Sequence, residues 1–227
     1  MSIDRTPLRH THLASLVLGA AALLAASGAH AQSAAVPLDC SAGQTTASVT
    51  IVTDTTWQQS TDGGTSWASA ANASNGGWGA APTGSSWIGN GSSGPVTPLF
   101  SRVLQLGAGV DLVVPLTVSA TFLVDDTLGG LTVGGLATGI SGGTYNGAPT
   151  TATGSVTLPA AGNYPIIATV NNTGGGAYGL AANLTITATC RAAPPAAVPA
   201  DAPWALGMLT GTIGLVAAAA VRRRRRG

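Results

Sequence analysis

Several stretches of the chain alternate apolar and polar side chains with a period of two residues. Such alternation places the apolar side chains on one face and predicts β-strands that are buried on one side. The stretches are ASVTIV, PLTVSATFLV, YPIIATV and NLTITATC, and their apolar sets are Ala47, Val49 and Ile51; Leu116, Val118, Ala120, Phe122 and Val124; Tyr164, Ile166, Ala168 and Val170; and Leu184, Ile186, Ala188 and Cys190.

Glycine-rich segments separate these predicted strands. GGLTVGG, SGGTYNG and NNTGGGAYG are of this kind, and we expect them to be connectors. Many short strands joined by glycine-rich turns favour an all-β fold, an antiparallel β-sandwich. We therefore expect residues 32–190 to form one β-sandwich domain, which is long enough to bury a hydrophobic core.

Residues 1–31 have the pattern of a secretory signal peptide. A basic start precedes an apolar run over residues 13–26, and the small residues of Ala29-x-Ala31 form a cleavage signature. The apolar run is too short for a typical membrane-spanning helix. We expect signal peptidase to cut between Ala31 and Gln32, and the rest of the chain to be exported.

The other end of the chain has the pattern of a membrane segment. Residues 204–221 carry no charge and would span about 27 Å as a helix, close to the thickness of a hydrocarbon core. The Arg-rich tail that follows, residues 222–227, is expected to stay in the cytoplasm because positive charge resists translocation. Residues 191–203, rich in proline and alanine, are predicted to be an extended linker.

Ionisable side chains are scarce in the exported part. All three histidines lie within the predicted signal peptide, and the sequence has no Lys and no Glu. A serine nucleophile would lack a conventional base, and the clustered cations that bind nucleic acid are missing, so we expect neither an enzyme nor a nucleic-acid-binding protein. The Asp and Arg residues between Gln32 and Pro199 are Asp39, Asp54, Asp62, Asp111, Asp125, Asp126, Arg102 and Arg191.

The two cysteines, Cys40 and Cys190, lie at the edges of the predicted domain. An even number of cysteines in an exported chain favours a disulfide, which here would tie the first strand to the last. Two unpaired thiols are the alternative.

Asp125 and Asp126 follow a predicted strand. Carboxylates in this position would bind Ca²⁺ together with backbone carbonyls, although a solvated acidic turn is the commoner arrangement. No Cys/His cluster suits zinc. We therefore expect no cofactor, with a structural calcium ion as the alternative.

The segment STDGGTSW, residues 60–67, resembles the Asp-box of sialidase-type propellers, where it is structural and repeated. One copy predicts a hairpin turn rather than a propeller. In such a turn Asp62 would accept backbone N–H groups, Gly63 and Gly64 would permit positive φ, and Trp67 would pack beneath.

Four tryptophans recur along this part of the chain, at Trp57, Trp67, Trp78 and Trp87. Buried, they would be core aromatics, and this is the favoured interpretation because the segment is otherwise poor in large apolar residues. Exposed in a row, they would stack on sugar rings.

The last residues of the chain resemble the sorting signals called PEP-CTERM and IPTL-CTERM, found on exported proteins of Gram-negative bacteria. Ala200-Asp201 stands where Glu-Pro or Thr-Leu is usual. The resemblance implies that an exosortase, a membrane protease-transpeptidase, removes the tail and releases the protein to the cell surface or into exopolysaccharide. The residues that carry it are Val198, Pro199, Trp204, Arg222, Arg223, Arg224, Arg225 and Arg226.

The region from Trp87 onward resembles the galactose-binding-domain-like jelly rolls of bacterial extracellular proteins. An apolar strand ends in an acidic turn, and a later strand, a glycine-rich loop and a final strand follow; Gly134-Gly135 replaces the usual Asn-Gly. The resemblance implies a jelly-roll form of the sandwich, an architecture that hosts both sugar binders and structural modules. The matching residues are Leu158, Gly162, Asn163, Asn171 and Leu180.

These features together predict an exported, non-catalytic protein of the bacterial cell surface or extracellular matrix. Its partners would be signal peptidase, an exosortase-like protease and, transiently, the inner membrane. The alternative is a secreted carbohydrate-binding module that holds a polysaccharide with residues 57–87. A permanent single-span anchor is the alternative fate of the tail, because the positive-inside pattern fits both.

Overall fold

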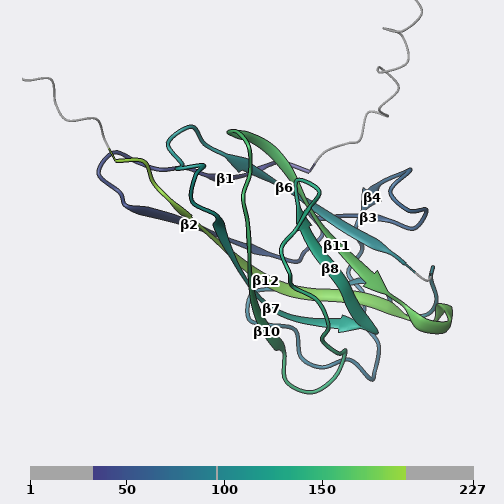
Figure 1. The fold of residues 1–227 in the computed structure, drawn as a ribbon. Helices are drawn as coiled ribbons and strands as arrows, with labels where there is room; N and C mark the ends of the chain where they lie inside the picture. Colours follow the sequence, from purple (N-terminus) through teal and green to yellow (C-terminus); the bar gives the residue numbers. More distant parts are fainter. Residues whose placement is uncertain (1–32, 96, 193–227) are drawn as a thin grey trace, which may run out of the picture. The chain divides into compact units, whose positions relative to one another are not determined.

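The computed structural model describes residues 33–95 and 97–192. Within them the fold is all-β, with two sheets whose neighbouring strands are antiparallel, apart from one parallel pair (Figure 1). This confirms the all-β, antiparallel prediction. The predicted signal peptide with its cleavage residues Ala29, Ala31 and Gln32 lies outside the described residues, as does the chain from residue 193 on, which holds the predicted sorting motif and transmembrane segment.

The larger sheet has the strand order β4-β3-β6-β11-β8-β9, and β1 lies beside β6 as the parallel strand. Hairpins form at both ends of this order, β3–β4 and β8–β9. Its strands are β1 (Val36–Leu38), β3 (Gln58–Ser60), β4 (Ala68–Ser69), β6 (Leu99–Leu106), β8 (Thr127–Val133), β9 (Leu136–Ala137) and β11 (Gly162–Asn171).

The smaller sheet has the order β10-β7-β12-β2, with β5 beside β12. The long central strands β7 and β12 pair over nine positions, from Gly179 opposite Asp125 to Thr187 opposite Thr117. Its strands are β2 (Thr46–Val52), β5 (Ile88–Asn90), β7 (Leu116–Asp125), β10 (Thr150–Val156) and β12 (Tyr178–Thr189); a 3₁₀ turn, η1 (Thr173–Gly175), precedes β12.

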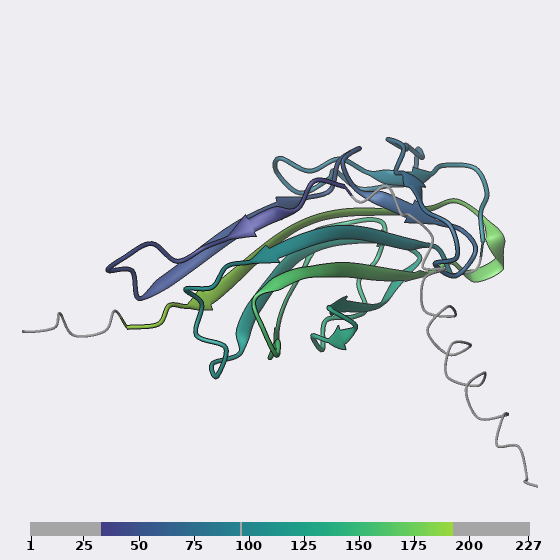
Figure 2. The same cartoon turned by 90° about the horizontal axis from the view of Figure 1, so that it is seen from above.

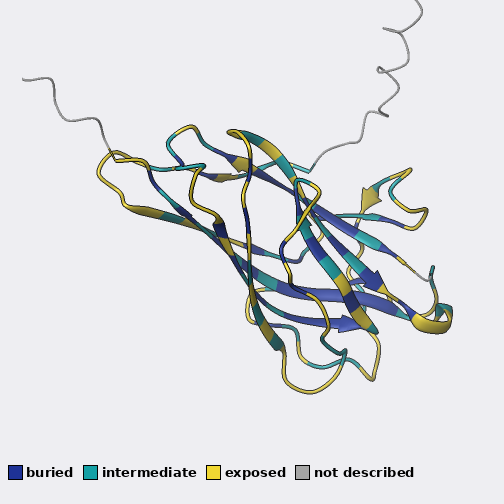
Figure 3. Ribbon diagram, in the orientation of Figure 1, coloured by how far each residue is buried: buried dark blue, intermediate teal, exposed yellow. Residues whose placement is uncertain are grey.

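The hydrophobic core is built from alternate residues of the strands of both sheets. Figure 2 shows these strands from above. The predicted apolar face of β7 is buried throughout, and β11 and β12 bury most of theirs in the same way. Figure 3 shows buried positions along β7 and β12, and exposed positions in the loops. The large side chains at the centre of the core include Trp57, Phe100 and Phe122.

One predicted connector is a strand. The first five residues of GGLTVGG belong to β8, which pairs with β11 and buries Leu131 and Val133, and its last two glycines form the turn to β9. Tertiary burial of these apolar side chains outweighs the low strand propensity of glycine. Gly129 falls at a register shift between β8 and β11, consistent with a bulge, a position where glycine is common in strands.

The chain passes from one sheet to the other at Asp126, the one residue between β7 and β8. A second link between the sheets is covalent. Cys40, just after β1 in the larger sheet, forms a disulfide with Cys190, just after β12 in the smaller one, with their Cα atoms 5.6 Å apart. The predicted disulfide between the ends of the domain is therefore confirmed.

Among the residues that the structure describes, no helix has the length and apolar character needed to cross a membrane.

Candidate functional site

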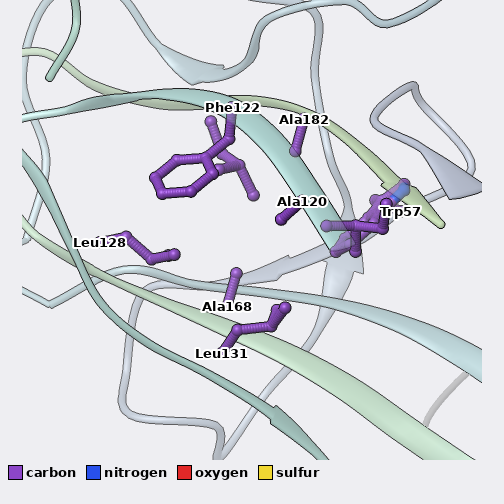
Figure 4. Close-up of a pocket in the computed structure, with 9 residues that line it drawn as sticks. Trp57, Ala120, Phe122, Leu128, Leu131, Ala168 and Ala182 are labelled. Carbon is purple, nitrogen blue, oxygen red and sulfur yellow. The ribbon is translucent and has the colours of Figure 1, made fainter. Parts of the chain in front are cut away.

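The space between the sheets leaves no room for a ligand. A cavity there has a volume of about 10 Å³ and is lined by Trp57, Phe122, Leu131 and other apolar residues (Figure 4). That volume is close to what one water molecule needs, and an apolar lining offers such a water no hydrogen-bond partners. This cavity is therefore too small to be a binding site, and the larger hollows lie elsewhere.

The Asp-box segment forms the turn of the β3–β4 hairpin, as predicted. Both oxygens of the Asp62 carboxylate are used within the turn: Oδ1 accepts from the Ser60 hydroxyl (2.8 Å) and the Ser66 backbone N–H (2.9 Å), and Oδ2 accepts from the Ser66 hydroxyl (2.5 Å). Gly63 and Gly64 have positive φ values of 73° and 90°, which glycine adopts without strain. Asp62 therefore organises a closed and rigid turn.

The hydrogen bonds of this turn lower the pKa of Asp62 to about 2. The Ser66 hydroxyl makes the largest contribution, and the Ser66 backbone N–H and the Ser60 hydroxyl add to it. Donors that stabilise the ionised carboxylate lower its pKa. The carboxylate is thus charged at neutral pH and already satisfied by its own turn.

The four tryptophans do not form one exposed row. Trp57 is 0 % exposed, faces the core and donates its Nε1–H to the Val52 carbonyl (2.8 Å). Trp87 is 9 % exposed and stacks on Trp78, with ring centroids 4.3 Å apart. For Trp57 and Trp87 the core interpretation is therefore correct, and neither offers a free ring face to a sugar.

The stacked pair covers the outer face of the smaller sheet rather than the main core. Trp87 packs with Leu123 and Ala181 in a separate small cluster, and Trp78 lies against it. A Cβ added to Gly179 would lie 2.7 Å from the Trp78 ring, so the close approach of the ring requires glycine there. This cluster holds the loop between β4 and β5 against the sheet.

Asp125 supports the same cluster. Its Oδ2 accepts the Trp78 Nε1–H at 2.6 Å, and the side chain is 7 % exposed, so the carboxylate is not in a solvated turn. Burial raises the pKa of Asp125. Asp126 accepts the Thr173 backbone N–H (2.6 Å), which ties the strand crossing to η1.

The candidate calcium pair, Asp125 and Asp126, is thus engaged by donors of the protein itself. Within residues 33–95 and 97–192, no group of three or more metal-ligating His, Cys, Asp or Glu side chains comes together.

We expect the free energy of unfolding of Asp125→Asn, measured relative to that of the wild type, to increase as the pH rises from 3 to 7. The pKa of Asp125 is higher in the folded protein than in the unfolded chain. Its contribution to stability is therefore fully present below its pKa in the unfolded chain, about 4, and is lost as the pH rises through its pKa in the folded protein. Asparagine keeps an oxygen for Trp78 but does not titrate. Thermal unfolding followed by circular dichroism at both pH values measures the difference, with the exposed Asp39→Asn as control. A difference that stays constant with pH would contradict the prediction.

Trp67 remains as the tryptophan beside a hollow on the surface. The hollow has a volume of about 340 Å³ and lies on the outer face of the larger sheet, over β3, β6 and β11. Strand register places Gln58 beside Ser101, and Ser101 beside Ile167, so that the three share one face. The lining residues are Gln58, Gly63, Gly64, Trp67, Leu99, Ser101, Val103, Pro165 and Ile167.

A second hollow adjoins the first. Its volume is about 480 Å³, and Thr132, Thr169 and Asn171 are among the polar residues that line it. Thr169 pairs with Leu99, which lines the first hollow, so the two hollows meet across neighbouring strands. They form a wider recessed surface on the larger sheet.

The sequence pattern singled out Gly63, Gly64 and Trp67 but missed the residues of the hollow that lie on β3, β6 and β11. The available signal was in LFSRVLQL, which has apolar residues on both faces: Phe100, Leu104 and Leu106 point into the core, while Leu99 and Val103 line the hollow. A strand that is apolar on both faces predicts that something covers the outer one. Which residues of β3 and β11 join it depends on strand register, which the pattern does not supply.

Comparison of the chain with protein-family models and with curated proteins returned no match. The interpretation of the site therefore depends on the residues and their geometry.

Proposed function

We propose that the protein is an exported, non-catalytic component of the bacterial cell surface or extracellular matrix. The observation that carries this proposal is the Cys40–Cys190 disulfide, because such bonds form and persist in oxidising compartments outside the cytoplasm. The signal-peptide pattern ending at Ala31 agrees with that compartment.

The described domain suits a structural role. Three of its carboxylates serve the fold, since Asp62 closes a turn, Asp125 holds Trp78, and Asp126 binds the backbone of η1. Catalytic carboxylates or nucleophiles are instead expected in a cleft, with a partner that transfers protons. This distribution supports a non-catalytic module.

We assign the module to the jelly-roll, galactose-binding-like form of sandwich. Two of the residues that carry the resemblance are buried apolar side chains: Leu158 lies in the loop before β11, and Leu180 lies in β12. Gly162 begins β11 with a φ of 152°. These positions support the assignment because the matched residues serve the strands rather than a loop ligand.

The tail of the protein is proposed to be a temporary sorting signal. An exosortase-like protease would recognise Val198, Pro199 and Trp204 together with the apolar segment, while the arginines 222–226 keep the end of the chain in the cytoplasm until cleavage. Removal of the tail would release the domain from the inner membrane.

Intact-mass analysis of the secreted protein tests this route. The expected mass corresponds to a chain that begins at Gln32 and ends close to Pro199. Replacing arginines 222–226 with alanine should reduce the processed product, because the retention charge is lost. The matched control is Arg191→Ala, an exposed arginine outside the tail. A surface-bound product that retains Gly227 would overturn tail removal and favour a permanent anchor.

A further inference from the structure

Trp67 is the tryptophan whose ring lines a surface hollow. Its indole N–H donates to the Gly64 carbonyl at 3.1 Å, and the ring lies against Gly64 at the edge of the recess. Asp62 closes the same turn with three hydrogen bonds. The ring is thus held in place before any ligand arrives, which lowers the entropy cost of binding.

The lining has the mixed chemistry of a sugar site. Leu99, Val103, Pro165 and Ile167 provide an apolar floor beside the indole. Gln58 and Ser101 add an amide and a hydroxyl, and their opposed register on β3 and β6 puts both on the side of the hollow. Ligand sites typically combine a mainly apolar lining with a few polar groups that fix orientation, in volumes above about 300 Å³.

The lining of the Trp67 hollow carries no charge, and this restricts the class of ligand that it can bind. None of its residues is ionisable. The neighbouring Asp62 is satisfied by Ser60 and Ser66, and Arg102 donates to the Thr56 carbonyl (2.7 Å). A phosphate, an acidic peptide or a basic peptide would bury its charge here without a counter-charge, which is unfavourable. A sugar carries no charge, has apolar C–H faces that pack on an indole, and has hydroxyls for an amide and a serine.

The adjoining hollow lengthens the surface. It presents the hydroxyls of Thr132, Thr169 and Ser141 and the amide of Asn171, again without an ionisable residue. Because Thr169 and Leu99 are cross-strand neighbours, a ligand that fills the Trp67 hollow would reach the second one directly. The recessed surface therefore suits a chain of sugar units better than one sugar.

The geometry points to a binding site for a neutral glycan chain on the outer face of the larger sheet, with Trp67 as the stacking platform and Gln58 and Ser101 as the hydrogen-bonding groups. The site differs from the exposed row of four tryptophans that was the alternative interpretation of the sequence, because Trp57 and Trp87 are buried. It does not depend on how the tail is processed, although a glycan ligand would retain a released protein in the matrix.

Affinity electrophoresis of the secreted protein, expressed from the full-length gene, tests the site. The gels contain dextran, xylan, mannan or soluble β-glucan as neutral probes and alginate as an acidic probe. We expect at least one neutral polysaccharide to retard the wild type, Trp67→Ala to weaken that binding about tenfold, and Trp67→Phe to retain part of it. Leu136→Ala, an exposed apolar residue of the same sheet outside the hollow, should bind as the wild type does.

A second variant distinguishes a loss of binding from a loss of the fold. Gln58→Leu keeps the side-chain volume and removes the amide, and should weaken binding about fivefold with an unchanged melting temperature.

The inference is overturned if none of the neutral probes retards the wild type, if only alginate does, or if the loss of binding in Trp67→Ala and Gln58→Leu equals that in Leu136→Ala. It is also overturned if Trp67→Ala instead abolishes self-association in sedimentation, because a second copy would then be the occupant. None of these outcomes alters the mass of the secreted product, so they are distinct from failure of the proposed sorting route.

Discussion

Replacing both cysteines with alanine is expected to lower the free energy of unfolding by about 5 kcal/mol. Cys40 and Cys190 are 150 residues apart in sequence, and a cross-link that closes so long a loop removes much of the conformational entropy of the unfolded chain. Small domains have total stabilities of about 5–15 kcal/mol, so the variant should be marginal or unfolded at 37 °C. Urea unfolding followed by tryptophan fluorescence measures the loss.

Reduction of the wild type provides the matched control. After treatment with dithiothreitol and alkylation, the unmodified sequence should show a loss close to that of the double alanine variant, because both remove the same cross-link. A double variant that stays within about 1 kcal/mol of the oxidised wild type would contradict the prediction, since the residual structure of the unfolded chain would then already restrict it.

The second large effect is expected at Trp57. Trp57→Ala should lower the free energy of unfolding by about 3–5 kcal/mol, because it empties a fully buried site and leaves the Val52 carbonyl without its indole donor. Trp57→Phe should cost less, since most of the buried volume is kept. Chemical denaturation at pH 7 measures both.

Trp67→Ala is the matched comparison, because the same substitution at a partly exposed tryptophan should cost far less stability than at Trp57. Losses of equal size at the two positions would contradict the assignment of Trp57 to the core and of Trp67 to a surface hollow. The pair of variants thus separates packing from binding.

The fold was predictable where burial follows strand periodicity. Along β7 every second side chain enters the core, so period-two alternation identified both the strand and its buried face. The disulfide was predictable for a different reason, since two cysteines have one possible partner each and the expected export favours their bond. The same method failed at Leu131 and Val133, where flanking glycines concealed a buried strand.

The candidate site was predictable only in part. The Asp-box spacing identified the turn at Asp62 and its tryptophan because that motif depends on residues close in sequence. The rest of the hollow places Gln58 and Ile167 on either side of Ser101, an arrangement that exists only after β3, β6 and β11 pair in register. Sequence spacing also could not separate Trp67 from Trp57 and Trp87, because partners distant in sequence decide which ring is buried.

The position of the disulfide has a mechanical consequence. Arg191 follows Cys190 directly, so a pull applied to the chain at Arg191 reaches the sulfur bridge first and passes to Cys40. Residues 41–189 lie inside the loop that the bridge closes, and tension between the two ends bypasses them. A module attached to a surface at one end and to a matrix at the other would thus carry load through one covalent bond and the short strand β1, while the other strands stay outside the load path.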